Sequence, residues 1–226
     1  MTMRRFAITA TLVTALAALA ACGNDTTSPQ PFNVVRQLVQ STGLRPEEPV
    51  PAVSNQQVAT AISSTNAPLM LFDLKSRDSQ AIMLRIEQNG PYDTYATSTR
   101  QSTTLRGGMI TATRGLGGDL MSSEPEALLE LIRTGREGTV PYAMRFLNGE
   151  DIIETLNYTC SLRHEGTARI AGGVINTEGR QMAVVCTGNA KSFESIFVTD
   201  RSGYVIYARQ WLGAFLGDAT VQTLRK

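Results

Sequence analysis

Two short segments of the chain combine charged, polar and glycine residues at a spacing that could serve ligand binding. The first covers residues 113–120, with the sequence TRGLGGDL. It is not a dinucleotide fingerprint, because Leu120 stands where the third glycine would fall, and no Gly-Lys-Ser/Thr follows to form a phosphate-binding loop. Its glycines favour tight turns or a close backbone approach, and Asp119 would bond local amides or pair with Arg114. The alternative is a ligand or partner site that contains Arg114 and Asp119.

The second segment is Arg209-Gln210-Trp211-Leu212, which holds the only tryptophan of the chain. A tryptophan near the end of a strand usually belongs to the core, since its large ring is mostly buried in folded proteins. Its aromatic face would also suit a pyranose ring. Arg209, Gln210 and Trp211 are therefore candidate glycan- or partner-binding residues, together with the arginine and aspartate of the first segment.

The sequence contains no recognisable catalytic or metal-binding pattern. Its one histidine, His164, lies beside Glu165 in an expected solvent-facing turn, and no Gly-x-Ser-x-Gly elbow of a hydrolase is present. Carboxylate pairs such as Glu124 and Glu126 occur, but glycosidase chemistry depends on their separation in space. We assign no catalytic residue, no metal and no cofactor. The formal net charge of +1 argues against nucleic-acid binding.

The N-terminus has the layout of a secretory signal peptide. Two arginines precede a short apolar run over residues 6–18, which ends in Leu19-Ala20-Ala21-Cys22. That tetrapeptide closely resembles a bacterial lipobox, in which the cysteine thiol takes a diacylglyceryl group and becomes the first residue after cleavage. We expect residues 1–21 to be a signal peptide and residues 22–32 a lipidated, flexible tether. An ordinary signal peptide with a chance cysteine is the alternative.

Lipidation of Cys22 would make the membrane a partner of this chain. Acyl chains contribute roughly 0.8 kcal/mol per buried methylene, so several chains give a stable anchor. By resemblance to enterobacterial sorting, Gly23 in place of an aspartate implies export to the outer membrane. We expect the protein to face the periplasm.

The other two cysteines, Cys160 and Cys186, would then lie in an oxidising compartment, where a disulfide is the default. Each falls on the apolar side of a candidate strand, so the two thiols would face one core. Closure of this loop would stabilise the fold by roughly 3–4 kcal/mol in the chain-entropy model. A reactive or metal-binding pair is the alternative, but no C-x-x-C spacing supports it.

Three segments have the apolar spacing of short helices. Residues 33–41 and 54–64 are the first two, and Ser54 is a possible N-cap of the second. The third, residues 124–134, begins at a possible capping box of Ser123 and Glu126 and ends at Gly135. Its expected buried stripe consists of Leu128, Leu131 and Ile132.

The remaining chain alternates with a period of two, which is typical of strands. In the first hairpin, Ile82, Leu84 and Ile86 form the apolar face, and a two-residue turn at Asn89-Gly90 pairs Leu84 with Tyr95. In a later hairpin, a three-residue loop over 147–149 pairs Met144 with Ile152. The other predicted strands cover residues 69–74, 94–104, 140–146, 167–176, 180–187, 192–199, 204–212 and 220–224.

This order of elements predicts a mainly β protein. Short strands with frequent turns and no alternation of strands with helices indicate an antiparallel β-barrel or sandwich with a few short peripheral helices. The domain would cover residues 33–226.

The lipobox, the all-β domain with residues 113–120, the two cysteines and Arg209-Gln210-Trp211-Leu212-Gly213 together resemble the YjbF/GfcB lipoproteins. The resemblance covers about residues 30–224, and Ala208 and Ala214 depart from the family's Ser and Pro at those positions. It implies a barrel-like fold, the outer membrane and a role in group 4 capsule or exopolysaccharide secretion. It also implies two partners from the same locus, an outer-membrane β-barrel and a periplasmic accessory protein. Relatives are not established enzymes.

We carry three hypotheses for function. The first is a non-enzymatic outer-membrane lipoprotein that supports exopolysaccharide or capsule secretion or assembly as an accessory or scaffold. The second is a glycan-binding module in which Trp211 and Arg114 contact the polysaccharide. The third is a polysaccharide-modifying enzyme that uses carboxylates.

Overall fold

The structure is a computed structural model that describes residues 52–226. The predicted signal peptide, Cys22, the tether and the predicted helix over residues 33–41 lie outside the described residues. Within 52–226 there are two α-helices, α3 (Asn55–Ser64) and α4 (Glu126–Thr134), and a 3-10 turn, η2 (Lys75–Arg77). The strands are β1 (Leu69–Leu74), β2 (Ser79–Asn89), β3 (Tyr92–Ala96), β4 (Ser102–Arg106), β5 (Met109–Arg114), β6 (Leu120–Ser123), β7 (Gly138–Leu147), β8 (Ile153–Gly172), β9 (Ile175–Gly188), β10 (Phe193–Thr199), β11 (Val205–Trp211) and β12 (Asp218–Arg225).

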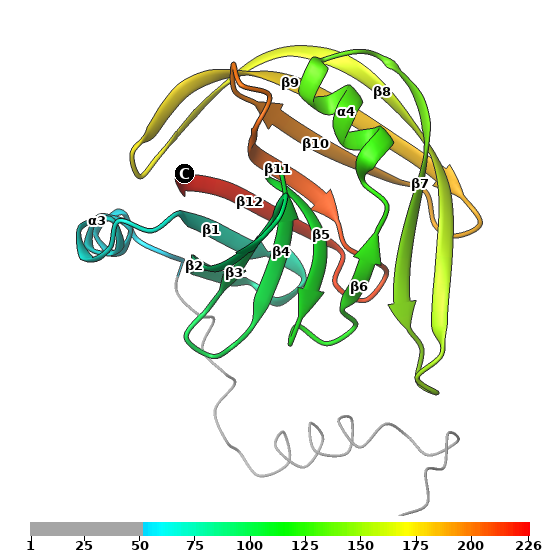
Figure 1. Cartoon of the computed structure of the whole chain (residues 1–226), viewed down its shortest axis with the longest axis horizontal. Helices are drawn as coiled ribbons and strands as arrows, with labels where there is room; N and C mark the ends of the chain where they lie inside the picture. Colours follow the sequence, from blue (N-terminus) through cyan, green and yellow to red (C-terminus); the bar gives the residue numbers. More distant parts are fainter. Residues whose placement is uncertain (1–51) are drawn as a thin grey trace, which may run out of the picture. The chain divides into compact units, whose positions relative to one another are not determined.

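The twelve described strands form one antiparallel sheet that curls into a nearly closed barrel (Figure 1). The strand order is β5-β4-β3-β2-β1-β12-β11-β10-β9-β8-β7-β6. The ends of this order, β5 and β6, follow each other in the chain and lie beside each other. We call their contact the seam. The predicted mainly β fold with short helices is confirmed, and of the two predicted architectures, barrel or sandwich, the barrel is observed. Near closure of the sheet reduces the exposed edges that an open sheet would leave.

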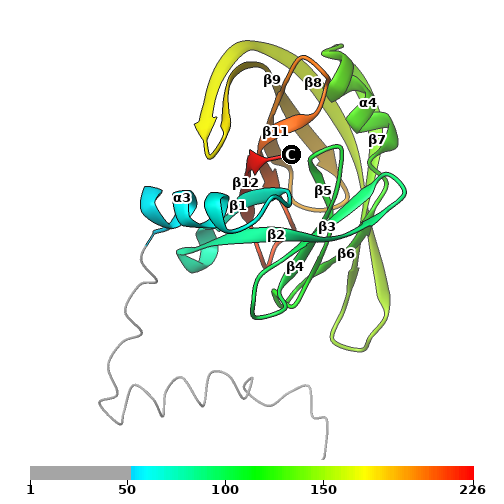
Figure 2. The same ribbon diagram turned by 60° about the vertical axis from the view of Figure 1, so that its left-hand side comes forward.

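The core fills the barrel with alternate side chains from every strand. Five of its fully buried side chains are methionines, at positions 70, 83, 109, 144 and 182. Their unbranched chains adapt to irregular spaces between curved strands. Helix α4 lies against β7, β8 and β10 and adds Leu128, Leu129 and Ile132 to this core (Figure 2).

The N-cap of α3 and the C-cap of α4 agree with the prediction, whereas the N-cap of α4 does not. Ser54 and Gln57 form the capping box of α3, so this helix begins where the sequence predicts. The capping box predicted for α4 is wrong, because Ser123 belongs to β6 and Pro125 occupies the N-cap position. Gly135 ends α4 in the left-handed conformation, as predicted, with φ of 68°.

The predicted stripe of α4 is wrong in one residue. Leu129 is buried, whereas Leu131 is only half-buried. The contact of Leu129 with Gly107, in the turn between β4 and β5, explains the difference, because this turn covers a second side of the helix.

The turn of the β2–β3 hairpin lies one residue later than predicted. The loop is Gly90-Pro91 rather than Asn89-Gly90, and Tyr95 pairs with the residue after Leu84. In a two-residue hairpin, the residue after the loop donates its N–H across the turn. Proline has no N–H, so Tyr92 rather than Pro91 is the first residue after the loop and pairs with Asn89.

The face of β2 is also the reverse of the prediction. Met83 is buried, whereas Leu84 and Ile86 are 36% and 61% exposed. The reason lies in the partner strand: Met83 pairs with Met70, whose side chain belongs to the core of the barrel. Because paired residues share a face, β1 determines which side of β2 points inward.

The β7–β8 loop is longer than predicted. The expected loop over 147–149 would have paired Met144 with Ile152, but Met144 pairs with Leu156. The side chain of Asn148 accepts hydrogen bonds from two backbone N–H groups of the loop, at 2.9 and 3.0 Å. These bonds stabilise the longer connection.

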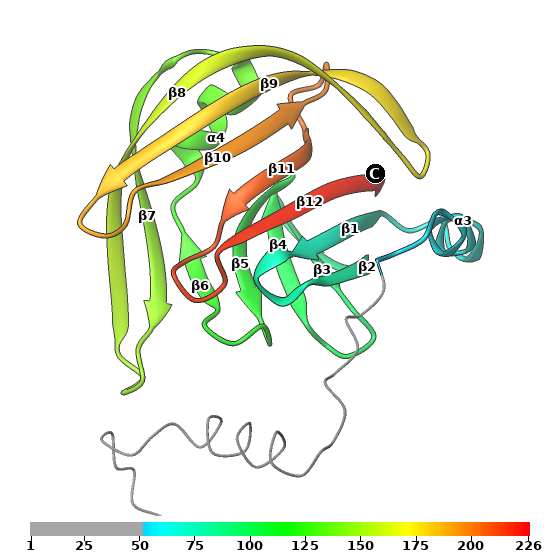
Figure 3. The same cartoon turned by 180° about the vertical axis from the view of Figure 1, so that it is seen from behind.

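Strands β8 and β9 form a hairpin much longer than the predicted elements. The turn predicted at residues 163–166 is wrong, because these residues belong to β8 and contain a bulge at Glu165, between His164 and Gly166. The predicted strand over 167–176 contains the β8–β9 turn at Gly173. The end of this hairpin arches back toward the last strand (Figure 3). It covers a second small core of Ile170, Val198 and Ile206.

Candidate functional site

The carboxylate of Asp119 holds the loop between β5 and β6. It accepts hydrogen bonds from the Thr113 hydroxyl at 2.9 Å and from the backbone N–H groups of Gly115 and Leu116 at 2.9 and 3.0 Å. An ionised carboxylate forms such bonds more strongly than a neutral acceptor. Asp119 therefore has the local structural role that its position among glycines suggested.

The guanidinium of Arg114 connects the two strands of the seam. It donates hydrogen bonds to the carbonyls of Thr113, Leu120 and Met121 at 2.6, 3.2 and 3.1 Å. The hydroxyl of Ser123 donates across the same seam to the carbonyl of Thr111 at 3.3 Å. Side chains thus make the connections that a backbone ladder makes between the other neighbouring strands.

The glycines of this loop permit a close approach by the loop between β11 and β12. Gly118 has φ of 69°, and a Cβ there would lie 2.6 Å from the ring of Phe215. Gly117 lies next to the guanidinium of Arg77, which stands 5.7 Å from the centre of the same ring. Three loops therefore meet at one end of the seam, and a side chain at position 118 would separate them.

Gln210 links β11 to β5 across the inside of the barrel. Its amide oxygen accepts from the backbone N–H of Ile110 at 3.0 Å, and its amide nitrogen donates to the carbonyl of Ile110 at 2.7 Å. The side chain is 2% exposed. A second contact joins the same two regions, because the N–H of Val205 donates to the carbonyl of Gly107 at 2.9 Å.

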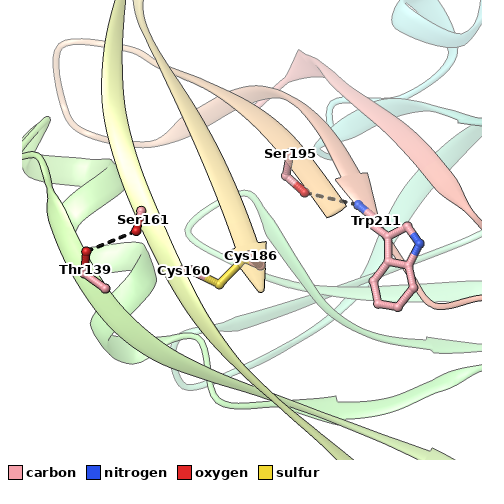
Figure 4. Close-up of a disulfide and its surroundings, with 6 residues drawn as sticks. All are labelled: Thr139, Cys160, Ser161, Cys186, Ser195 and Trp211. Atoms are coloured by element: carbon pink, nitrogen blue, oxygen red, sulfur yellow. Dashed lines mark hydrogen bonds between the residues drawn. A yellow bond between two sulfur atoms is a disulfide. The ribbon is translucent and has the colours of Figure 1, made fainter. Parts of the chain in front are cut away.

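Trp211 belongs to an aromatic cluster in the core. Its ring stacks on Phe193 at 4.5 Å between centres and meets the edge of Tyr158 at 6.1 Å. Its backbone N–H donates to the hydroxyl of Ser195 at 3.3 Å (Figure 4). The residue is 6% exposed. Its participation in glycan binding stays a prediction, as does that of Arg209, a half-buried residue on the opposite face of the strand from Gln210.

The predicted disulfide between Cys160 and Cys186 is present (Figure 4). The two residues stand directly opposite each other on β8 and β9, and both are fully buried. The sequence placed each cysteine on an apolar strand face, and the long hairpin explains why the two meet. The disulfide adds a covalent connection to an existing backbone ladder.

The carboxylates considered for catalysis take part in ion pairs. Glu124, between β6 and α4, pairs with Arg145 of β7, and Glu126 of α4 pairs with Arg106 of β4. His164 is exposed at the bulge of β8, where its Nδ1 accepts from the N–H of Gly166 at 3.3 Å. Within residues 52–226, no three His, Cys, Asp or Glu side chains gather to form a candidate metal site.

A large surface groove within residues 52–226 was not predicted from the sequence. It is an open groove of about 810 Å³ formed by residues 174–177, residues 200–202, Ile206 and residues 225–226. These segments come from two separate turns and the last strand, and no local pattern indicates that they meet. The long β8–β9 hairpin brings them together.

The turn at Asp200 forms one wall of this groove. Its carboxylate accepts hydrogen bonds from the N–H and the hydroxyl of Ser202 and from the N–H of Tyr204, and it pairs with Lys226. Burial alone would raise the pKa of Asp200, but the hydrogen bonds from Lys226, Ser202 and Tyr204 outweigh this effect and lower the pKa.

The chain is similar to known lipoproteins in sequence and in fold. The family model described as "Group 4 capsule polysaccharide lipoprotein gfcB, YjbF" matches residues 38–224. The crystal structure of the hypothetical lipoprotein YmcC from Escherichia coli (K12) has a similar fold, with a TM-score of 0.66 and 12% sequence identity. That similarity covers 89% of this chain and 98% of the other. No curated protein sequence matches the chain. Neither helix in residues 52–226 has the length and hydropathy needed to cross a membrane.

Proposed function

This chain belongs to the family of group 4 capsule polysaccharide lipoproteins, and on that premise we propose that it supports the secretion or assembly of a capsule or exopolysaccharide. The match over residues 38–224 carries this proposal, because it includes nearly the whole barrel. In the proposed function the protein is a non-enzymatic accessory or scaffold.

The contacts of the sequence motifs support a scaffold. Arg114, Asp119 and Gln210 direct their polar atoms to backbone groups of the barrel, and Glu124 and Glu126 are paired with arginines. Side chains engaged in this way stabilise the fold and are not poised for proton transfer to a substrate. Turnover of exopolysaccharide by the purified protein would contradict this part of the proposal.

The lipobox and the family together support a lipid anchor on Cys22. We place the anchored protein at the outer membrane, facing the periplasm. Its proposed partners are an outer-membrane β-barrel and a periplasmic accessory protein from the same locus. If the protein is a scaffold, it should co-purify with that membrane barrel from mild detergent.

Deletion and rescue test the proposal. Deletion of the gene should reduce secreted polysaccharide strongly, and the wild-type gene should restore it. Cys22→Ser should not restore secretion, because the unlipidated protein has no anchor. Gly23→Asp keeps the cysteine but alters the expected sorting signal, so it tests membrane location separately from lipidation. Normal secretion in the deletion strain would overturn the proposed function.

A glycan-binding role is the second candidate, and the groove favours it. Its volume of about 810 Å³ lies within the range of about 300–1,000 Å³ for small-molecule sites. Binding would give a scaffold a direct contact with the material that its pathway exports.

A further inference from the structure

The groove described above is built by segments that hydrogen bonds hold in place. The end of the β8–β9 hairpin forms its roof and lies close to the end of the last strand (Figures 1 and 3). The N–H of Val174 donates to the carbonyl of Leu224 at 2.9 Å, and the amide of Gln222 donates to the carbonyl of Ala171 at 3.0 Å. The roof is therefore fixed to β12, and the groove is formed before any ligand arrives.

Glycine at the hairpin turn makes this attachment possible. A Cβ at Gly173 would lie 2.4 Å from the carbonyl oxygen of Leu224, which no real side chain could tolerate. The small core of Ile170, Val198 and Ile206 lies under the hairpin and supports the roof from below. The apolar surface of the groove comes from the roof itself, where Val174 is 59% exposed and Ile175 is half-buried, whereas Ile206 lies in the small core and is 1% exposed.

The rim of the groove is polar and carries more cations than carboxylates. Its one carboxylate side chain, Asp200, is paired with Lys226. Arg225 donates to the backbone carbonyls of Ile62 and Thr65, and it forms no ion pair in the part of the chain that the structure describes. Arg201 is exposed and forms no ion pair within residues 52–226.

The remaining polar groups of the rim both donate and accept hydrogen bonds. They are the amide of Asn176 and the hydroxyls of Thr177 and Ser202. Within the fold the Asn176 amide oxygen accepts from Arg169 and both hydroxyls donate, so a ligand would meet the amide nitrogen as a donor and the hydroxyl oxygens as acceptors. An apolar roof beside donors and acceptors suits a sugar ring, which has apolar C–H faces and a belt of hydroxyls. A guanidinium at the rim suits a carboxylate, because its planar fork can donate two parallel hydrogen bonds.

We propose that this groove binds an acidic oligosaccharide, with a uronate carboxylate at Arg201 and the sugar rings against Val174. The inference rests on the proposed function, since it names the class of polysaccharide that the protein would contact. The groove is open at the surface, so a segment inside a long polymer can enter it as readily as a chain end. It is separate from the residues of the seam and from Trp211.

Calorimetric titration of the full chain in detergent tests the inference with three probes. Tetragalacturonate is the acidic sugar, maltotetraose is a neutral sugar of equal length, and tetraglutamate is a peptide with comparable charge. Tetragalacturonate should bind saturably and more weakly at high salt, because charge pairs at an exposed rim are screened. Maltotetraose and tetraglutamate should each bind at least about tenfold more weakly. Maltotetraose lacks the carboxylates, and tetraglutamate lacks the sugar rings.

Two variants locate the site. Arg201→Ala should weaken tetragalacturonate binding about tenfold by removal of the guanidinium. Val174→Asp places a negative charge on the exposed roof and should also weaken binding, and neither exposed residue is needed for the core. Arg136→Ala is the matched control, since this exposed arginine lies beyond the end of α4 and does not line the groove.

Three results would overturn the inference: no binding of tetragalacturonate, equal binding of tetraglutamate, or an equal effect of Arg201→Ala and Arg136→Ala. The proposed function has its own test in the deletion strain. If deletion stops secretion but the groove binds no acidic sugar, the groove inference fails and the proposed function stands. If deletion has no effect on secretion, the proposed function fails whatever the groove binds.

Discussion

The barrel closes differently at the seam and between β8 and β9. Strands β8 and β9 share a long backbone ladder, from Tyr158–Gly188 to Gly172–Ile175, and a disulfide crosses it. At the seam, the side chains of Arg114 and Asp119 make the main connections. A ladder tolerates many sequences because the backbone makes its bonds. The seam depends on particular residues, which explains why the TRGLGGDL segment stands out in the sequence.

The largest effect should come from Gln210, which joins β5 to β11 behind the seam. Gln210→Leu keeps the volume of the side chain but leaves the N–H and carbonyl of Ile110 buried without partners. At about 1–3 kcal/mol for each group, we expect a loss of about 4 kcal/mol in the free energy of unfolding. Urea denaturation measures this loss.

Gln222→Leu is the matched control for Gln210. The hydrogen bond from the side-chain amide of Gln222 to the carbonyl of Ala171 lies at an exposed position, where water can replace the lost partner. We expect a loss below about 1 kcal/mol. Equal losses for the two variants would show that the link inside the barrel does not stabilise the closed form.

Loss of the disulfide should have the next largest effect. Cys160→Ala combined with Cys186→Ala should lower the free energy of unfolding by about 3 kcal/mol, because the unfolded chain regains the freedom of the closed loop. A reducing agent should destabilise the wild type to a similar extent and should not affect the double variant. A loss below about 1 kcal/mol would show that the ladder alone determines the stability of this hairpin.

A smaller and local effect is expected at the seam itself. Asp119→Ala removes the acceptor for Thr113, Gly115 and Leu116, and at a partly exposed site we expect a loss of about 2 kcal/mol. Hydrogen exchange should accelerate at the amides of residues 115–120 and stay unchanged in the β8–β9 ladder. Glu150→Ala, in the exposed β7–β8 loop, is the control. Faster exchange throughout the barrel would contradict a local role.

Sequence patterns predicted the fold class and the disulfide because these follow from alternation of apolar residues over whole strands. Residues 113–120 were also expected to be structural, because glycines and an aspartate hold loops by short-range bonds. No pattern among neighbouring residues indicates which residues meet across the inside of a barrel. The hydrogen bonds between Gln210 and Ile110 could therefore not be predicted. Nor could the faces of β2, which depend on pairing with β1.

Some errors were avoidable. Pro91 follows Asn89-Gly90 directly, and its missing N–H excludes the predicted turn. The groove was beyond prediction for a different reason. Its walls come from segments around residues 175, 201 and 225, and only the curvature of the long hairpin brings them together.

The smallest effect is expected at the turn of Asp200. This turn, like the loop at Asp119, is stabilised by hydrogen bonds from neighbouring groups to a carboxylate. Hydrogen bonds from Lys226, Ser202 and Tyr204 outweigh burial and lower the pKa of Asp200 below that of an unfolded aspartate, about 3.9. A group whose pKa is lower in the folded state contributes stability above the unfolded pKa, and this contribution is lost as pH falls through the folded pKa. We therefore expect urea titrations between about pH 6 and pH 2 to show a loss of stability below about pH 4 that is smaller in Asp200→Asn. An identical acid dependence in the variant and the wild type would show that protonation of Asp200 does not couple to unfolding of the barrel.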